Sequence, residues 1–306
     1  MKNFAPRVPG CWKKAVATTF LVSVLASTAA CSGATQTATK IEPSASAAPL
    51  ADLLPADIKA KGSIIVGTQP DFEPANFTPI GENGVKGFNI DLMDAMAAKL
   101  GLKVTYQKVP FDQLLVGVQN GKFDASIAGM TDRPGRQEKV DFVDYQVAGT
   151  VFMVAKGNPK KITGELNGGC GIKIGGVKGN DDERLVNLMA KACTAEGKPA
   201  PELMTFPTGS DKNLALTSGR VDAMFWPDMA VSVVQRETGG KLESVPVNFE
   251  EKVFLGMIFN KQAPQLRDAF LKATEAIHED GTYDEILKKW DVTVIDLPTP
   301  GINLAK

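Results

Sequence analysis

Residues 111–128 read FDQLLVGVQNGKFDASIA and contain a helix signal, a stop and a strand signal in that order. Apolar residues recur at i, i+3, i+4 and i+7 from Phe111 to Val118, which is the spacing of one face of an α-helix. Gly121 is typical of a helix end, and a strand is expected at 124–128. This order predicts one unit of an α/β layered fold.

The same alternation continues on both sides of this unit. Upstream, strands are expected at 63–67 and 103–109, with a helix at 90–100 that Gly101 ends. Downstream, the order strand, helix, strand, helix, strand restarts without a sequence repeat. The second series comprises strands at 172–177, 203–206 and 221–225 and helices at 182–193 and 213–218. A body of about 255 residues with two such series predicts two lobes.

Two apolar, extended segments, 150–155 and 254–260, are candidates for crossings between the lobes. If both cross, the helical patterns at 264–279 and 283–290 return to the first lobe. A pair of crossings forms a hinge, and a hinge suggests closure around a ligand. The predicted division is 51–153 plus 257–306 for lobe 1 and 154–256 for lobe 2.

The N-terminus is typical of a secretory signal peptide over residues 1–30. Basic residues precede an uncharged run at 15–30, which is short for a membrane span. The small residues before Cys31 resemble a bacterial lipobox, which implies lipidation of Cys31. Ordinary cleavage after Ala30 is the alternative, because Thr28 stands where lipoproteins usually carry Leu. Residues 31–50 are rich in Ser, Thr and Ala and are expected to form a flexible tether.

Charge and cysteine usage narrow the function classes. Removal of residues 1–30 takes away four basic and no acidic side chains, so the formal net charge falls from −1 to −5 and a nucleic-acid partner is disfavoured. Cys170 and Cys193 remain in an oxidising compartment, where a disulfide is predicted and two buried free thiols are the alternative. The single histidine, His278, lies on the polar side of a helical pattern. The chain therefore lacks the histidines that zinc sites and His-activated nucleophiles commonly need, and neither a metal nor a cofactor is predicted.

Several short motifs occur together in a fixed order. They are Val66-Gly67-Thr68, Gly87-Phe88-Asn89-Ile90-Asp91-Leu92, Gly121-Lys122-Phe123-Asp124-Ala125 with Gly129-Met130-Thr131, Arg136 with Val140-Asp141-Phe142, and Ser218-Gly219-Arg220-Val221-Asp222-Ala223. In this order, residues 62–292 resemble the type 3 extracellular solute-binding proteins, the substrate receptors of amino-acid ABC importers. The resemblance implies a two-lobed periplasmic-binding-protein fold of type II, with a mixed sheet flanked by helices in each lobe and a ligand cleft between the lobes.

The resemblance also implies how such a protein works. It is expected to be an extracytoplasmic, monomeric receptor, lipid-anchored to the cell membrane. It would capture a polar amino acid or related amine-bearing solute by hinge closure and deliver it to ABC permease subunits. Two other classes stay open: an enzyme on the same fold that resembles cyclohexadienyl dehydratase, for which Glu73 is a conceivable general acid, and a ligand-sensing module.

The first lobe supplies half of the implied site. Arg136 matches the arginine that grips the ligand carboxylate, and a guanidinium group suits a planar carboxylate. Gly129 and Thr131 match the strand-end segment that shares the ligand. Phe111 and Phe72 match the walls around the ligand side chain, although either could be a core residue.

The second lobe departs from the family pattern. Gly179, Asn180 and Asp181 stand where relatives carry Gly-Thr-Thr, so Asp181 would repel a carboxylate unless it serves as a helix cap. Asp228 is the candidate for the ligand ammonium, one position later than in relatives, with Trp226 as a stacking wall for a cation. In the first lobe, Gln69 stands where some receptors for cationic amino acids carry an acid. Asp71 is a further candidate for contact with the ligand.

Overall fold

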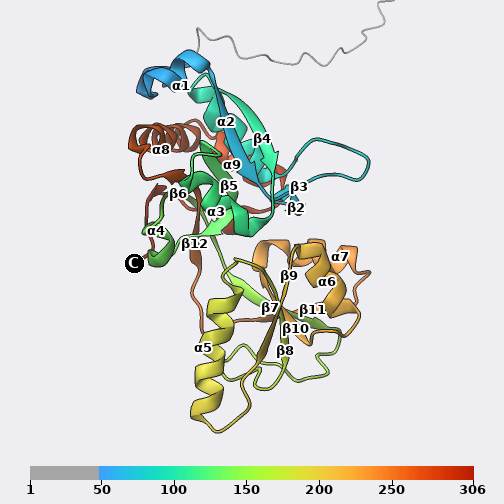
Figure 1. Cartoon of the computed structure of the whole chain (residues 1–306). Coiled ribbons are helices and arrows are strands. Elements are labelled where there is room, and N and C mark those ends of the chain that lie inside the picture. Colours follow the sequence, from blue (N-terminus) through green and yellow to red (C-terminus); the bar gives the residue numbers. More distant parts are fainter. Residues whose placement is uncertain (1–47) are drawn as a thin grey trace, which may run out of the picture. The chain divides into compact units, whose positions relative to one another are not determined.

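The computed structural model describes residues 48–306, which belong to one compact unit. The predicted signal peptide, Cys31 and the tether as far as residue 47 lie outside the described residues. In the described part, helices and strands alternate and form two main sheets, as predicted (Figure 1).

The first sheet has six strands in the order β13-β6-β12-β5-β1-β4. Strands β1, β4 and β5 run parallel, whereas β12 runs antiparallel to both β5 and β6. The strands are β1 (Ser63–Thr68), β4 (Lys103–Lys108), β5 (Ala125–Thr131), β6 (Val140–Ala148), β12 (Val253–Asn260) and β13 (Gly301–Ile302). A small separate pair, β2 (Asp71–Phe72) and β3 (Asn76–Phe77), follows β1.

Helices cover both faces of the first sheet, because its strands bury side chains alternately on each side. In β12, Met257 and Phe259 join the core that contains α2 and α8, whereas Ile258 joins the core under α3. The helices of this lobe are α1 (Ala56–Lys61), α2 (Phe88–Lys99), α3 (Phe111–Gln119), α4 (Pro134–Gln137), α8 (Pro264–Glu279) and α9 (Thr282–Lys289). We call this sheet and its helices the first lobe.

The second sheet has five strands in the order β11-β7-β10-β8-β9. They are β7 (Thr150–Ala155), β8 (Lys173–Val177), β9 (Glu202–Phe206), β10 (Ala223–Pro227) and β11 (Leu242–Pro246). Along β10, Met224 and Trp226 face the core that includes α6 residues, whereas Ala223 and Phe225 face the core that includes α5 residues. The helices are α5 (Asp182–Ala195), α6 (Gly209–Thr217) and α7 (Val231–Glu237). We call this sheet and its helices the second lobe.

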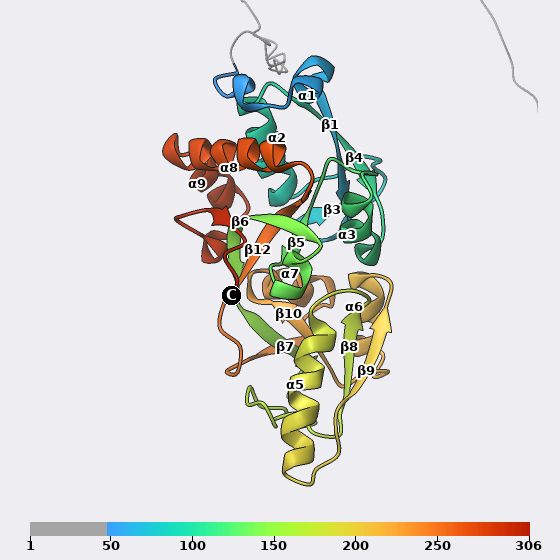
Figure 2. The same ribbon diagram turned by 60° about the vertical axis from the view of Figure 1, so that its left-hand side comes forward.

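The chain changes from one sheet to the other twice. It does so first at Gly149, between β6 and β7, and again within residues 247–252, between β11 and β12. Figures 1 and 2 show β6 and β12 with the first sheet and β7 with the second. Segments 150–155 and 254–260 are therefore strands inside the sheets, and the crossings lie just before each of them. The lobe boundaries expected at 153/154 and 256/257 stay a prediction about domains, a few residues from these changes of sheet.

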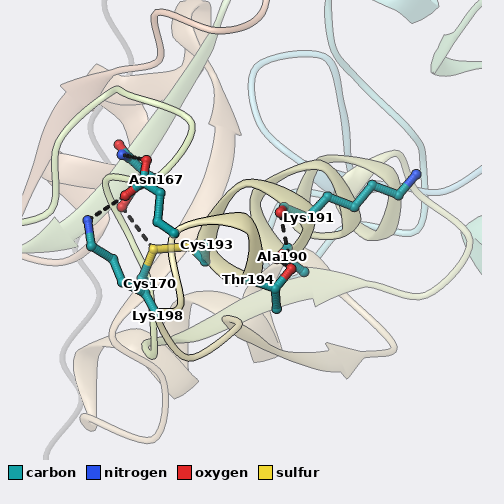
Figure 3. Close-up of a disulfide and its surroundings, with 8 residues drawn as sticks. Asn167, Cys170, Ala190, Lys191, Cys193, Thr194 and Lys198 are labelled. Carbon is teal, nitrogen blue, oxygen red and sulfur yellow. Dashed lines mark hydrogen bonds and ion pairs between the residues drawn. A yellow bond between two sulfur atoms is a disulfide. The ribbon is translucent and has the colours of Figure 1, made fainter.

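The predicted disulfide is present between Cys170, in the loop before β8, and Cys193, near the end of α5 (Figure 3). Cys193 is fully buried, and the two Cα atoms lie 5.6 Å apart. The bridge therefore fastens α5 to the loop that leads into β8, within the second lobe.

Candidate ligand-binding site

A cavity of about 130 Å³ lies between the two lobes and is lined by residues from both. Loops and strand ends of the first lobe meet β8, β10 and the starts of α5 and α6 across it. Seven of the predicted site residues line this cavity: Asp71, Phe72, Phe111, Gly129, Thr131, Asp181 and Trp226. Arg136, Gly179 and Asp228 are not among its lining residues. The structure thus brings most of the candidates to one place, and their contact with a ligand stays a prediction.

Aromatic side chains form the apolar part of the cavity wall. Phe72 meets Trp226 of the opposite lobe edge to face, with ring centroids 5.1 Å apart. Phe111 lines the cavity and is also packed in the core under α3, where it is 8% exposed. Phe111 is therefore both a core residue and part of the cavity wall, the two alternatives given for it above.

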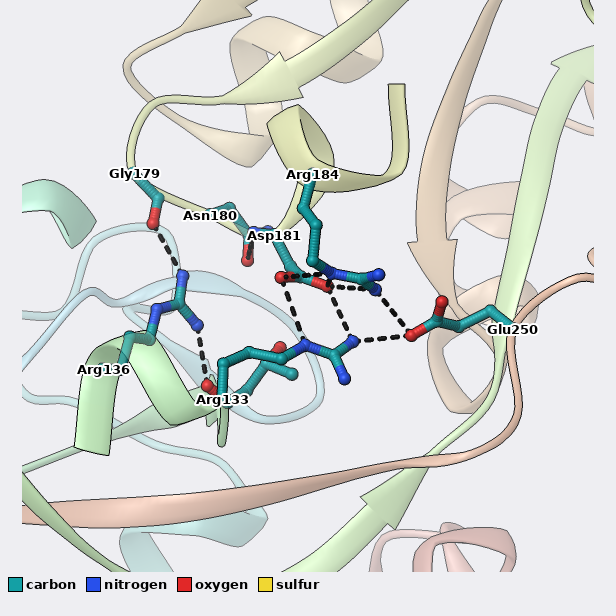
Figure 4. Close-up of polar contacts among 8 residues, drawn as sticks. Arg133, Arg136, Gly179, Asn180, Asp181, Arg184 and Glu250 are labelled. Carbon is teal, nitrogen blue, oxygen red and sulfur yellow. Dashed lines mark hydrogen bonds and ion pairs between the residues drawn. The ribbon is translucent and has the colours of Figure 1, made fainter. Parts of the chain in front are cut away.

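Arg136 bridges the lobes beside the cavity. Its guanidinium group donates to the carbonyl oxygen of Thr131 at 2.8 Å and to that of Gly179 at 2.9 Å (Figure 4). Burial lowers the pKa of Arg136 from its ordinary value. Among residues 48–306, Arg136 forms no ion pair. Its positive charge is thus held by neutral carbonyl groups.

Asp181 is neutralised by arginines, so it does not present a bare negative charge. Its carboxylate accepts hydrogen bonds from Arg133 at 2.9 Å and Arg184 at 2.9 Å, and both arginines also reach Glu250 at 2.6 Å (Figure 4). Burial alone would raise the pKa of Asp181, but the hydrogen bonds from Arg184 and Arg133 outweigh it and hold the pKa below its ordinary value. Asp181 occupies the N-cap position of α5 without a side-chain capping bond. It is therefore part of a contact between lobes.

Asp228 lies next to the first change of sheet. Its backbone N–H donates to the carbonyl oxygen of Gly149 at 3.0 Å, and a side chain at Gly149 would collide with the Asp228 carboxylate. The buried Oδ1 atom of Asp228 has no hydrogen-bond partner within residues 48–306. Burial raises the pKa of Asp228. This carboxylate thus keeps an unused acceptor close to the cavity residues Gly149 and Thr150.

Asp71 joins the two lobes from the first-lobe side of the cavity. Its carboxylate accepts a 2.8 Å hydrogen bond from the backbone N–H of Gly209, at the start of α6, and a 3.2 Å bond from Gln69. Burial raises the pKa of Asp71. Asp71 has no ion-pair partner in the described part of the chain, and the nearby charge of Lys212 acts on its pKa in the direction opposite to burial.

Two charged residues that line the cavity were not predicted as site residues. Lys212 on α6 and Asp182 at the start of α5 form a buried ion pair, with Nζ and Oδ2 3.5 Å apart. In the sequence, Lys212 falls in a polar helix and Asp182 at a helix start, where both are normally solvated. No sequence signal marks them, because their pairing depends on how α5, α6 and β10 come together.

Glu73, the conceivable catalytic acid, points elsewhere. Its carboxylate pairs with Arg236 of the second lobe at 2.8 Å, and it does not line the cavity. Within residues 48–306, no group of three His, Cys, Asp or Glu side chains is placed to hold a metal ion. Over the same residues, none of the helices has the length and apolar character needed to span a bilayer.

Comparison with known proteins places this architecture in one family. The profile of the bacterial extracellular solute-binding proteins, family 3, matches residues 64–293. The L-cystine-binding protein TcyA of Bacillus subtilis (strain 168) is 26% identical over 278 residues, which cover 91% of this chain and 97% of that protein. The ABC transporter glutamine-binding protein GlnH of the same strain is 28% identical over 239 residues, or 77% of this chain and 83% of that protein.

A solved structure agrees with these relatives. An ancestral arginine-binding protein bound to arginine is 34% identical, with a TM-score of 0.68 over 75% of this chain and 98% of that one. The two-lobed fold and the resemblance found in the sequence are therefore confirmed. These relatives are named as amino-acid-binding proteins, and GlnH is named as the glutamine-binding protein of an ABC transporter. The chain belongs to the bacterial extracellular solute-binding proteins of family 3.

Proposed function

We propose that this chain captures a polar amino acid or a related amine-bearing solute in the cavity between its lobes and delivers it to an ABC permease. The observation that carries the proposal is that both lobes line one cavity, and that an acid and an arginine without ion-pair partners among the described residues lie at it or beside it. Asp71 supplies a carboxylate on the wall, and Arg136 supplies a guanidinium group beside it. A zwitterion presents the complementary ammonium and carboxylate groups.

In this proposal Arg136 receives the ligand carboxylate, with Thr131 and Gly129 beside it. Asp228 receives the ammonium group, and the carboxylate of Asp71 adds negative charge on the cavity wall. The support for Asp228 is its unpartnered Oδ1 atom, although the side chain must turn toward the cavity to reach a ligand. The remaining predicted residues would surround the ligand. They are Phe72 and Phe111 on the first lobe, Asp71 at its edge, and Gly179, Asp181 and Trp226 on the second lobe.

We further propose that the protein works outside the cytoplasm as a monomer anchored by a lipid on Cys31. The extracellular character of the family supports this location, and the sequence around Cys31 supports the anchor. We propose that the chain is not an enzyme, since its relatives are binding proteins and Glu73 is paired with Arg236 away from the cavity. Mass spectrometry of the N-terminal peptide of membrane-extracted protein would detect a diacylglyceryl group on Cys31.

The receptor role is tested with residues 42–306, which contain all of the described residues, in a thermal-shift screen of amino acids, polyamines and betaines. A ligand that binds the folded state raises the melting temperature by mass action. The ligand found is then added to protein spin-labelled at exposed positions 103 and 191, one in each lobe. A shorter distance between the labels and a smaller radius of gyration are expected on closure. Failure of every compound to bind would overturn the proposed function, and binding without a change of distance would overturn hinge closure.

A further inference from the structure

Lys212 is a buried cation in the wall of the cavity. Its side chain is 3% exposed, and its ammonium group donates to the carbonyl oxygen of Phe225 at 3.0 Å. The carboxylate of Asp182 lies 3.5 Å away and accepts a 2.9 Å hydrogen bond from the backbone N–H of Val177. A buried charge is costly unless it is paired and hydrogen-bonded. These partners therefore allow the fold to keep an ammonium group beside the ligand space.

The same ammonium group lies over the ring of Trp226. Lys212 Nζ lies 4.6 Å from the ring centroid, in the position of a cation–π contact. Phe72 meets the ring from the first lobe with centroids 5.1 Å apart, and a Cβ atom at Gly209 would lie 3.3 Å from it. A ligand cation that approached Trp226 would compete with a cation of the protein itself. On one face of the Trp226 ring, the position expected for a ligand cation is thus already taken by the Lys212 ammonium group.

Where Trp226 and Lys212 form the wall, the atom left without a partner among the described residues is a hydrogen-bond donor, whereas the unpartnered acceptor of Asp228 lies beside Gly149 and Thr150. The indole Nε1 atom of Trp226 is buried and has no partner within the described residues. Asp181 is held by Arg133 and Arg184, and Asp182 is held by Lys212, so the two acids of α5 are both compensated. The second-lobe wall therefore offers an indole N–H and a nearby positive charge, which suit a ligand group that accepts hydrogen bonds.

We propose that Lys212 is a specificity-determining residue, which disfavours ligands with a cationic side chain and favours those whose side chain ends in a neutral or anionic acceptor group. This inference rests on the proposed function. It concerns only the end of the ligand that faces β10 and α6. Asp71, which forms no ion pair within the described residues, lies on the opposite lobe and is itself within the influence of the Lys212 charge, so a cationic side chain drawn to Asp71 would still share this small cavity with Lys212.

The test compares arginine and glutamine, which differ in the charge of the side chain, on residues 42–306 by calorimetry. Lys212→Met removes the ammonium group at similar volume, and it should raise the affinity for arginine relative to glutamine by about tenfold. Asp182→Asn leaves the ammonium uncompensated and should lower the same ratio by about tenfold. The double variant, Lys212→Met with Asp182→Asn, removes both charges together and should lie between the two single variants.

The controls separate this effect from loss of charge or of folding. Lys173→Met removes an exposed lysine of the same lobe and should leave the ratio unchanged, and Lys212→Arg should keep the ratio of the parent protein. Circular dichroism melting shows whether each variant is folded. If a single variant does not fold, the double variant can be used instead, because it leaves neither Lys212 nor Asp182 as an unpaired buried charge. A ratio that is the same in the parent, Asp182→Asn and double variants overturns the proposal. If the parent binds no amino acid but Lys212→Met gains arginine binding, the role of Lys212 stands while the proposed function fails.

Discussion

The guanidinium group of Arg136 donates a 2.9 Å hydrogen bond to the carbonyl oxygen of Gly179 and so joins α4 of the first lobe to the loop after β8 of the second. A residue expected to hold a ligand is thus also a bridge between the lobes. The proposed ligand contact and the observed lobe contact involve the same side chain, and the two roles can be separated by experiment.

Replacement of Arg136 by Ala should weaken ligand binding by about 2–4 kcal/mol, because a charge-assisted hydrogen bond to the ligand is lost. Calorimetry with the ligand from the screen measures the change. The melting temperature without ligand should fall only slightly, since the bonds lost in the protein go to backbone carbonyl groups. Arg220→Ala, away from the cavity lining, is the matched control. Unchanged affinity in Arg136→Ala would remove this residue from the site.

Arg133→Gln should weaken binding by a smaller amount, about threefold to tenfold. Arg133 forms ion pairs with Asp181 of the second lobe and with Glu250 in the link between β11 and β12, and Arg133 itself does not line the cavity. Partly buried pairs of this kind are worth about 1 kcal/mol each, so their loss destabilises the closed form modestly. Added salt should weaken the ligand affinity of the parent protein more than that of the variant. Equal salt dependence in the two proteins would show that the cluster does not contribute to closure.

Removal of the disulfide should lower stability without lowering affinity. The bridge spans a sequence separation of 23 residues, for which loop-closure entropy predicts about 3 kcal/mol of stabilisation. Urea unfolding of the variant with Cys170→Ala and Cys193→Ala measures this loss. Neither cysteine lines the cavity, so calorimetry should give the parent affinity. Peptide mapping without reductant that found both thiols free in the parent would contradict the bridge.

Asp144 should make the protein less stable as the pH rises from 4 to 8. This residue is fully buried on β6, and burial followed by the proximity of Asp132 raises its pKa to about 8. The folded state therefore holds the Asp144 proton more tightly than the unfolded state. The resulting stabilisation is complete below about pH 4 and is lost as the pH rises through about 8, by at most about 1.4 kcal/mol per pH unit.

Urea unfolding at several pH values checks this expectation. Asp144→Asn keeps the shape of the side chain and an oxygen that can accept the 2.9 Å hydrogen bond from Leu304 N–H. It removes the titration, so the difference in stability between the two proteins should change with pH in the direction given above. A difference that stays constant from pH 5 to pH 8 would rule out a raised pKa at Asp144.

The sequence predicted the elements that carry a regular apolar pattern. The stripe from Phe111 to Val118 became α3, and the alternating strands and helices on both sides of it became two sheets with their flanking helices. These elements are determined locally, because their apolar spacing matches a single period. Strand β6 was not predicted, since Asp144 and Gln146 interrupt its apolar pattern. Asp144 is tolerated there because a backbone N–H from the tail, at Leu304, donates to it.

The site was predicted unevenly for a related reason. Phe72, Gly129 and Thr131 lie in motifs with recognisable spacing, and they line the cavity. Lys212 and Asp182 have no such spacing. Each is stabilised by groups on other elements, namely the Phe225 carbonyl oxygen and the Val177 N–H, which a linear sequence does not bring together.

The two connections between the lobes are unequal in length, and this gives the proposed closure a geometry. A single residue, Gly149, links β6 to β7, whereas residues 247–252 link β11 to β12. In the proposed closure the short link would be the pivot, and the longer link, which ion pairs of Glu250 with Arg133 and Arg184 hold in place, would have to move with the second lobe. In a rotation, displacement grows with distance from the axis, so Asp228, bonded to Gly149, travels least. In the proposed closure, contacts near the pivot would therefore form while the lobes are still apart and could select the solute. Contacts far from the pivot would form only in the closed state and would hold the solute that is already bound.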